Sequence, residues 1–175
     1  MILTTERLII RHPQRSDAVA LNSAILESIG ELRKYMIWAN QIPALTDTQN
    51  NIENAIQLIE ANMDIRFLIF SENDAFVGAS GLHKIDWHIK KAEIGYWIRT
   101  SMSGKGLMTE AVDAIANYGF NELGLRRIEI IVSGSNSKSR HIPERLGFTL
   151  EGRLRNHRIN NDGMIDDTLY YAKVV

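Results

Sequence analysis

Cysteine is absent from the 175-residue sequence, and its absence excludes several classes of protein. Without thiols the chain has no disulfide, no thiolate-bound metal or iron–sulfur cluster and no cysteine nucleophile, which excludes a secreted disulfide scaffold. No run approaches the roughly 18 apolar residues that cross a bilayer. The N-terminus becomes charged at Glu6 and Arg7, before a signal peptide could develop. We therefore expect a cytoplasmic protein without a membrane partner.

A marked excess of charge of one sign is also absent. The chain has 20 Lys and Arg against 21 Asp and Glu, a net charge of −1, so we do not expect a protein that coats nucleic acid. Only three prolines occur, and the 45% hydrophobic and 23% charged fractions are ordinary for a globular protein. No repeat or flexible linker interrupts the chain, and its length predicts a single domain over residues 1–175.

The near-neutral charge is an average over unequal parts of the chain. Residues 126–158 contain eight Lys and Arg side chains against three Glu, whereas residues 1–125 are acidic overall. A basic segment of this kind suits a compact anion, although a solvated charged face is the alternative. The five histidines lack the spacing of metal ligands, so we expect no metal site.

Hydrophobic periodicity predicts a mixed α/β chain of about seven strands and about four helices. The helices are expected at residues 16–29, 48–63, 107–123 and 137–146. The strands are expected at 8–11, 66–71, 76–82, 92–98, 127–132, 150–159 and 164–174. Two helices precede the second strand, and three strands then follow one another, so the order predicts a mixed sheet rather than a strict βαβ repeat.

The loop at residues 103–108, Ser-Gly-Lys-Gly-Leu-Met, leaves an expected strand and opens an expected helix. Gly104 and Gly106 allow positive φ and a close approach of backbone to ligand. The first turn of a helix has unpaired N–H groups and the positive end of the dipole, so this loop suits a diphosphate. It is not a P-loop, because Gly106 rather than Ser or Thr follows Lys105. A flexible turn without a ligand is the alternative.

The block at residues 92–148 resembles the GNAT acetyltransferases. The loop of that family reads Arg/Gln-x-x-Gly-x-Gly/Ala; Gly106 matches the central glycine, while Ser103 and Met108 depart from the outer positions. The resemblance covers essentially the whole chain. Features typical of the RimJ/RimL branch are Met108, Glu93-Ile-Gly-Tyr-Trp97, Asn136 with Ser139, Leu146-Gly-Phe148, Thr-Glu-Arg-Leu at residues 5–8 and Leu-Glu-Gly at residues 150–152.

The resemblance implies a GNAT fold, in which the strands at 92–98 and 127–132 splay apart, and acetyl-CoA as cosubstrate. It implies that loop N–H groups hold the CoA pyrophosphate and that the end of the strand at 92–98 bonds the pantetheine. Arg140 and Arg145 are candidate partners of the nucleotide phosphate, and Lys105 compensates in part for the missing Arg or Gln at position 103. The implied CoA-binding residues are Trp97, Ile98, Arg99, Gly104, Lys105, Gly106, Leu107, Met108, Thr109, Asn136 and Ser139.

Transfer of an acetyl group to an amine requires a neutral amine and help for the departing thiolate. Glu93 is the leading base candidate, because it shares a strand face with Gly95 and Trp97; an ion-paired or orienting role is the alternative. His83 and His157 are weaker candidates. By resemblance, Ser139 hydrogen-bonds the CoA sulfur; an ordinary polar residue in the first turn of a helix is the alternative.

The acceptor is the least determined part of the prediction. The aromatic residues Tyr35, Trp38, Trp87 and Trp97 are candidates for the walls of an acceptor cleft, with core packing as the alternative. By resemblance to the RimL-type enzymes we expect transfer to the N-terminal α-amine of a protein, in particular a ribosomal protein. The alternatives are a small amine (polyamine, aminoglycoside or amino acid) and a CoA-binding protein without turnover. A homodimer is carried over from relatives.

Overall fold

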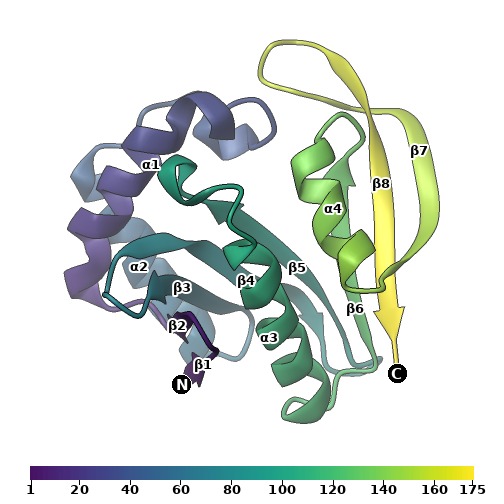
Figure 1. Ribbon diagram of the computed structural model, residues 1–175, viewed down its shortest axis with the longest axis horizontal. Helices are drawn as coiled ribbons and strands as arrows, with labels where there is room; N and C mark the ends of the chain where they lie inside the picture. The colour runs from purple at the N-terminus through teal and green to yellow at the C-terminus, as the bar shows by residue number, and fades with distance from the viewer.

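A computed structural model describes residues 1–175, and its centre is one mixed sheet of eight strands in the order β1-β2-β3-β4-β5-β6-β8-β7 (Figure 1). The predicted α/β class, the seven predicted strands and the four predicted helices are confirmed. The eighth strand, β1, was not predicted, because three residues are too few for a periodic signal. The strands are β1 Ile2–Thr4, β2 Leu8–Arg11, β3 Ile65–Ser71, β4 Phe76–Asp86, β5 Lys91–Ile98, β6 Arg127–Ser133, β7 Thr149–Ile159 and β8 Ile165–Val174.

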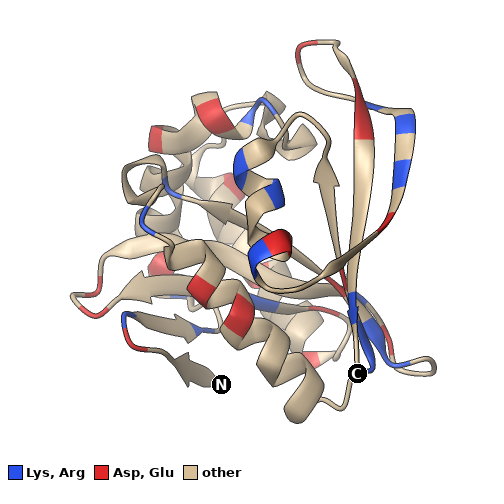
Figure 2. Cartoon of the chain, turned by 45° about the vertical axis from the view of Figure 1, so that its right-hand side comes forward, with Lys and Arg blue, Asp and Glu red and all other residues tan.

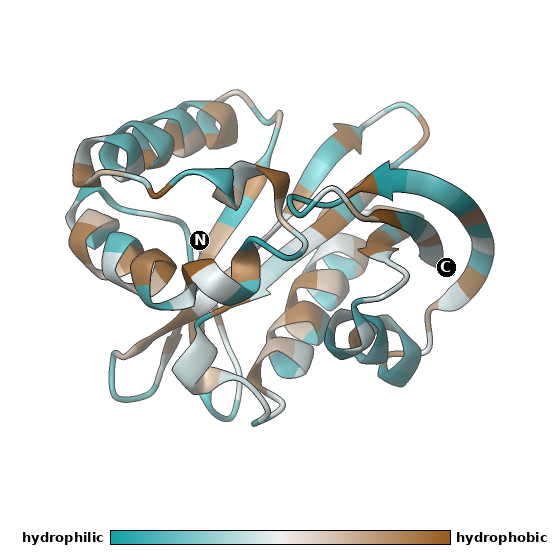
Figure 3. Ribbon diagram, turned by 90° about the horizontal axis from the view of Figure 1, so that it is seen from above, coloured by the Kyte–Doolittle hydropathy of each residue, from teal (hydrophilic) through white to brown (hydrophobic).

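The helices cover both faces of this sheet. They are α1 Ala18–Leu32, α2 Leu45–Glu60, α3 Leu107–Asn121 and α4 Ser137–Arg145, with short 3-10 turns at Arg15–Asp17, Ile37–Asn40 and Thr100–Met102. Polar and apolar stripes alternate around the helices, as an amphipathic helix on a sheet requires (Figure 3). None of them is long and apolar enough to span a membrane.

Two hydrophobic clusters fill the space between the sheet and its helices. The larger has 24 buried residues and joins α3 to the strands from β2 to β8. The smaller has 10 buried residues and joins α1 and α2 to β3 and β4. Strand β5 contributes to both, because successive side chains point to opposite faces: Ile94 belongs to the α3 cluster, and Trp97 packs against the α1–α2 cluster.

All strand pairs are antiparallel except β5 and β6, which run parallel. This parallel pairing covers only Lys91–Arg127, Ala92–Ile128 and Glu93–Glu129. From residue 94 onward, β5 has no register partner on the β6 side, and in Figure 1 the two strands run apart toward the N-terminal end of α4. The edge of β5 is therefore open over residues 94–98.

Candidate active site

The loop at 103–108 has the conformation that its glycines predict. Gly104 has φ 80° and Gly106 has φ 76°, both in the left-handed region that favours glycine. Helix α3 begins directly after Gly106, so the N–H groups of its first turn face the loop. The side chains of Leu107 and Met108 are buried in the core, and only the backbone of these two residues is available to an anion.

Met108 stands at a loop position where the resemblance leads one to expect Gly or Ala, and the structure explains the larger residue. Its side chain lies over Gly78 of β4, where an added Cβ would come within 2.9 Å of the Met108 Cε and 2.4 Å of the Trp97 carbonyl oxygen. The large residue on α3 thus fills a space left by a glycine on the sheet. The Met108 side chain packs over Gly78 and so anchors the loop to β4, which a smaller residue at position 108 would not do.

The N-terminal segment braces this loop, a function that the sequence analysis did not assign to it. Arg7 donates from Nε to Glu110 Oε2 at 2.7 Å and from Nη1 to the Lys105 carbonyl at 3.1 Å. The Thr5 hydroxyl also donates to Glu110, at 2.5 Å. Burial raises the pKa of Glu110, but hydrogen bonds from Thr5 and Arg7 outweigh it and lower the pKa overall. The guanidinium of Arg7 therefore lies beside the loop in which Ser103 replaces the usual Arg or Gln.

The open edge of β5 presents polar backbone groups. The Arg99 N–H bonds to the Val77 carbonyl of β4 at 2.8 Å. In an antiparallel ladder alternate residues face the partner, so Tyr96 and Ile98 direct their N–H and C=O groups toward the side of β6, where no strand pairs with them. The side chain of Arg99 is bound to Glu27 of α1 at 2.6 Å. Within the segment from Trp97 to Arg99, the backbone of Ile98, rather than the Arg99 side chain, can thus bind an extended ligand.

Ser139 and Asn136 lie at the start of α4, on the other side of this opening. The Asn136 side chain caps the helix by accepting from the Ser139 N–H at 3.1 Å. The Ser139 hydroxyl donates to the Tyr96 oxygen at 3.1 Å, and the Tyr96 hydroxyl donates to the Ser139 carbonyl at 2.9 Å. Burial raises the pKa of Tyr96 well above its ordinary value, so the phenol stays protonated. Two hydroxyl groups therefore meet where β5 and α4 approach each other.

Asp166 of β8 holds the loop that leads into α4. Its carboxylate accepts from the Ser133 hydroxyl, from the Ser135 hydroxyl at 2.7 Å and from the Ser135 N–H at 3.2 Å. Burial raises the pKa of Asp166, but these hydrogen bonds dominate and lower it to about 2. The carboxylate is therefore ionised at neutral pH and fixes the backbone just before Asn136.

Positive charge gathers on α4 and again along β7 (Figure 2). Arg140 of α4 donates to the Gly134 carbonyl at 3.3 Å and lies 3.6 Å from Glu144, while its Nε is buried without a partner. An unpaired guanidinium N–H beside the opening fits an anionic group. The residues present thus fit coenzyme A: a helix N-terminus for its pyrophosphate, a free strand edge for its amide arm and an arginine beside the start of α4.

A cavity of about 570 Å³ lies on the opposite face of the sheet, between α1, α2 and strands β3 to β5. Trp38 and Trp97 line it, with ring centroids 6.3 Å apart, as two of the predicted aromatic walls. Tyr35 and Trp87 do not line it. The remaining walls are largely apolar, and the polar and charged lining residues include Asp47, Thr48, Asn51, Arg66, Ser80 and His83.

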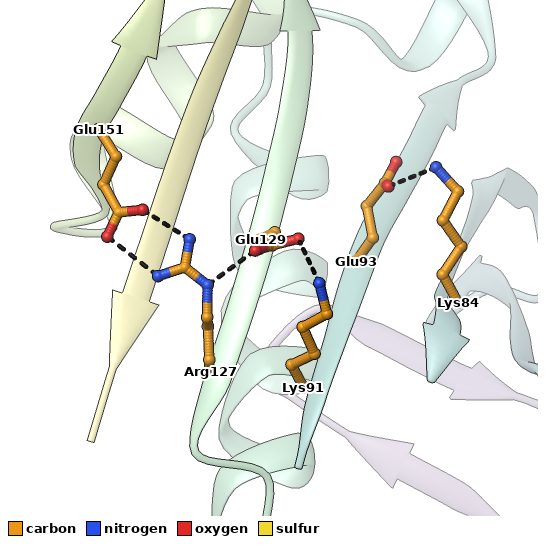
Figure 4. A network of polar contacts seen from close by, with 6 residues as sticks. All are labelled: Lys84, Lys91, Glu93, Arg127, Glu129 and Glu151. Carbon is orange, nitrogen blue, oxygen red and sulfur yellow. Dashed lines mark hydrogen bonds and ion pairs between the residues drawn. The ribbon is translucent and has the colours of Figure 1, made fainter. Parts of the chain in front are cut away.

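Glu93 lies at the closed end of β5, outside the residues that line the cavity. Its Oε2 accepts from the Lys84 Nζ at 2.8 Å (Figure 4). In the register of the sheet Glu93 is directly opposite His83, which does line the cavity. His157 bonds to Thr168 on the β7–β8 ribbon and does not line the cavity. The structure therefore brings His83, and neither Glu93 nor His157, to the cavity wall.

We predict that Arg7→Ala weakens coenzyme A binding, because the loop carbonyl at Lys105 and the Glu110 carboxylate both lose a charged donor. The expected rise in the dissociation constant is about tenfold, as measured by isothermal titration calorimetry. Arg15→Ala, which removes an exposed ion pair with Glu53, is the matched control and should leave affinity unchanged. Equal affinity in the two variants contradicts a bracing role for Arg7.

We predict that Asp166→Asn lowers stability at neutral pH by about 1–2 kcal/mol. A depressed pKa stabilises the folded state above the unfolded-state pKa, and this contribution is lost as the pH falls toward 2. The difference from the wild type in urea unfolding should therefore be constant above about pH 5 and shrink toward pH 2. Asp162→Asn, in the exposed turn before β8, is the control. A difference that does not change with pH counts against the proposed role.

The residues at 7–149 match a family model described as an acetyltransferase (GNAT) domain. The chain is 35% identical to YdaF of Bacillus subtilis (strain 168) over 172 residues, which are 95% of this chain and 91% of that protein. It is 30% identical to the ribosomal-protein-serine acetyltransferase of Escherichia coli (strain K12) over 144 residues, 82% of this chain and 79% of that one.

Among solved structures, RimL, a ribosomal L7/L12 alpha-N-protein acetyltransferase in complex with coenzyme A, matches with a TM-score of 0.94. It is 26% identical and the match covers 100% of this chain and 98% of that one. The chain belongs to the GNAT acetyltransferase family, as an acetyl-CoA-dependent N-acetyltransferase with RimL/RimJ-type relatives.

Proposed function

We propose that the acceptor of this N-acetyltransferase is the N-terminal α-amine of a protein, specifically a ribosomal protein. The observation that carries the proposal is the match to RimL over the whole chain. That protein is named for acetylating a protein α-amine, and the match includes α1 and α2, which form one side of the cavity.

The charges of the cavity support a monoamine rather than a polyamine. A polyamine carries several positive charges and needs several carboxylates to bind it. Asp47 is the only acidic residue among those lining the cavity, and its carboxylate already accepts from the Ala44 N–H at 2.8 Å. Arg66, also in the lining, adds a positive charge. An amine on a largely uncharged carrier fits this cavity better.

The acid–base chemistry also favours an α-amine. An α-amine with a pKa of about 7.8 is roughly one tenth neutral at pH 7, whereas a lysine side chain near 10.4 is neutral several hundred times less often. Glu93 is our proposed source of the negative charge that favours loss of the amine proton. Since Glu93 lies outside the cavity lining, it acts through an intervening group or water.

On the other side of β5, the proposed cofactor-binding residues are those implied by the family. The N–H groups from Gly104 to Thr109 hold the pyrophosphate, and the β5 edge from Trp97 to Arg99 holds the pantetheine arm. Asn136 contacts that arm. The Ser139 hydroxyl, which donates to the buried Tyr96 phenol in this structure, turns its proton to the sulfur as the thioester breaks. Coenzyme A supplies the activated acetyl group, and the chain positions it at the end of β5.

An acceptor panel tests the proposal, with thiol release as the readout. The key pair is a peptide with a free N-terminus and no lysine, and the same peptide with its N-terminus blocked and one lysine added. We expect kcat/KM at pH 7 to be at least about 100-fold higher for the free N-terminus. Spermidine, an aminoglycoside and free amino acids complete the panel. Preference for any of these over the peptide contradicts the proposal.

For Ser139 we predict a change in turnover rather than in binding. Ser139→Ala should lower kcat about tenfold, because a thiolate with a pKa near 8.5 leaves readily and needs only modest help. The KM for acetyl-CoA should remain within about twofold. Ser137→Ala, two residues earlier in the same turn, is the matched control. An unchanged kcat in Ser139→Ala contradicts a role at the sulfur.

A further inference from the structure

We propose that His83, oriented by Asp64, is the group that takes the proton from the acceptor amine, and that Asp64 is its positioning residue. The inference rests on the proposed acetyl transfer to an amine and names the residue that connects the cavity to the carboxylates. It depends on a side-chain pair that the sequence places 19 residues apart: Asp64 directly before β3, and His83 on β4.

The first step is the orientation of the imidazole. The His83 Nδ1 lies 2.7 Å from the Asp64 Oδ1. Burial raises the pKa of Asp64, but the hydrogen bond from His83 and the charges of His83 and Arg66 lower it overall, so this carboxylate is ionised. An ionised carboxylate only accepts hydrogen bonds, so Nδ1 carries the proton. The lone pair of neutral His83 is therefore on Nε2, ready to accept a proton.

The second step is the packing of the His83 imidazole against the sheet. An added Cβ at Gly81 would come within 3.1 Å of the His83 Cε1, and one at Gly95 within 3.3 Å of Cδ2 and 3.4 Å of Nε2. Gly81 and Gly95 are register partners on β4 and β5. The imidazole thus lies across a pair of glycines that leave room for it. A larger residue at Gly95 would press on the ring, and one at Gly81 would also meet the Ile65 carbonyl oxygen of β3 at 2.6 Å.

The third step is access to the acceptor. His83 lines the cavity together with Gly95, Tyr96 and Trp97. Tyr96 also bonds to Ser139, the residue proposed for the CoA sulfur, at 3.1 Å. Strand β5 therefore carries residues of the cavity wall directly beside the residue that bonds to Ser139, at the strand end where the thioester is expected. The His83 side chain is 31% exposed, so a proton accepted in the cavity can pass on to water.

Charged groups of both signs surround His83. Asp64 bonds to it directly, and Arg66 donates to the second carboxylate oxygen of Asp64 at 3.2 Å. Glu93 faces it across the β4–β5 pair, where Cβ atoms are about 5 Å apart, with Lys84 bound to Glu93. From α2, Asp47 lines the same cavity. The His83 ring therefore lies between the Asp64 and Glu93 carboxylates, and through it Glu93 acts without reaching the cavity.

The reaction balances with one proton released. The ammonium form of the acceptor gives a proton to the His83 Nε2, and the neutral nitrogen forms a C–N bond with the acetyl carbon. The C–S bond breaks, and the thiolate takes up the second proton that the nitrogen loses on becoming an amide. His83 then passes the first proton to water. No oxidant, reductant or metal is needed.

The test compares the wild type, His83→Gln, Asp64→Asn and the matched control His12→Gln. His12 is another partly buried histidine whose Nδ1 lies near a protein acceptor, the Arg66 carbonyl at 3.0 Å, and it does not line the cavity. At pH 6.5 we expect His83→Gln to lower kcat/KM for the acceptor about 100-fold, with Asp64→Asn in between and His12→Gln unchanged. The KM for acetyl-CoA should not change.

The pH profile separates a proton acceptor from a residue that only supports the fold. The deficit of His83→Gln should shrink as the pH rises past about 8, because the amine then loses its proton without help. In His83→Ala, added imidazole should restore part of the rate. A His83→Gln deficit that is the same at every pH, or wild-type rates in that variant, overturns the inference.

Two further readouts, an NMR measurement and the activity of the wild type on the acceptor panel, distinguish failure of the His83 inference from failure of the proposed function. Nitrogen-15 NMR of the free protein should show the neutral His83 ring as the Nδ1–H tautomer, in which the protonated Nδ1 has a lower chemical shift than Nε2. An Nε2–H tautomer overturns the orientation argument without any activity measurement. If the wild type transfers acetyl to no amine in the panel, the proposed function fails and the inference fails with it. If the wild type is active and His83→Gln matches it, only the inference fails.

Discussion

The short parallel pairing of β5 with β6 is the constraint on which the rest of the site depends. Three register pairs hold the two strands together, and an ion-pair network closes the same end (Figure 4). Glu129 of β6 accepts from Arg127 at 2.7 Å and lies 3.8 Å from Lys91 of β5, while Arg127 also binds Glu151 of β7. Side chains of β5, β6 and β7 are thus linked at this end of the sheet, and β5 pairs with β6 at this end only. The free end of β5 can offer its backbone to a ligand because its other end is held.

The loop and the helix start on either side of this opening are braced by distant parts of the chain. Arg7 and Glu110 connect the N-terminal segment to the loop before α3, and Asp166 connects β8 to the loop before α4. Both carboxylates have lowered pKa values, because the hydrogen bonds they accept outweigh the effect of burial. The starts of α3 and α4 are therefore positioned by ionised groups behind them, which leaves the proposed binding groups free for coenzyme A.

The sequence predicted the parts of the site that depend on local conformation. Gly104 and Gly106 indicate positive φ by themselves, and the start of α3 follows from the apolar period after them. The start of α4 at residue 137 was also predicted, whereas the cap that Asn136 provides to this helix was not. The pair of Asp64 with His83 was not predictable, because it depends on the register of β3 with β4 and on two glycines that leave space for a ring. Glu93 was correctly placed on the Trp97 face, but periodicity cannot show where the cavity ends.

The alternation of β5 divides the chemistry between the two faces of the sheet. Tyr96 bonds to Ser139 on the α4 side, whereas Trp97, the next residue, packs with Trp38 and Phe76 on the α1–α2 side. A slip of one residue in the pairing of β5 would exchange these faces and move Gly95 away from the His83 ring. The Gly81–Gly95 pair joins β4 to β5, and the Glu93–Glu129 pair joins β5 to β6. Both depend on the position of β5, so they shift together if β5 slips. The contacts that hold the closed end of β5 therefore also set which side chains face the proposed thioester site and which face the proposed amine site.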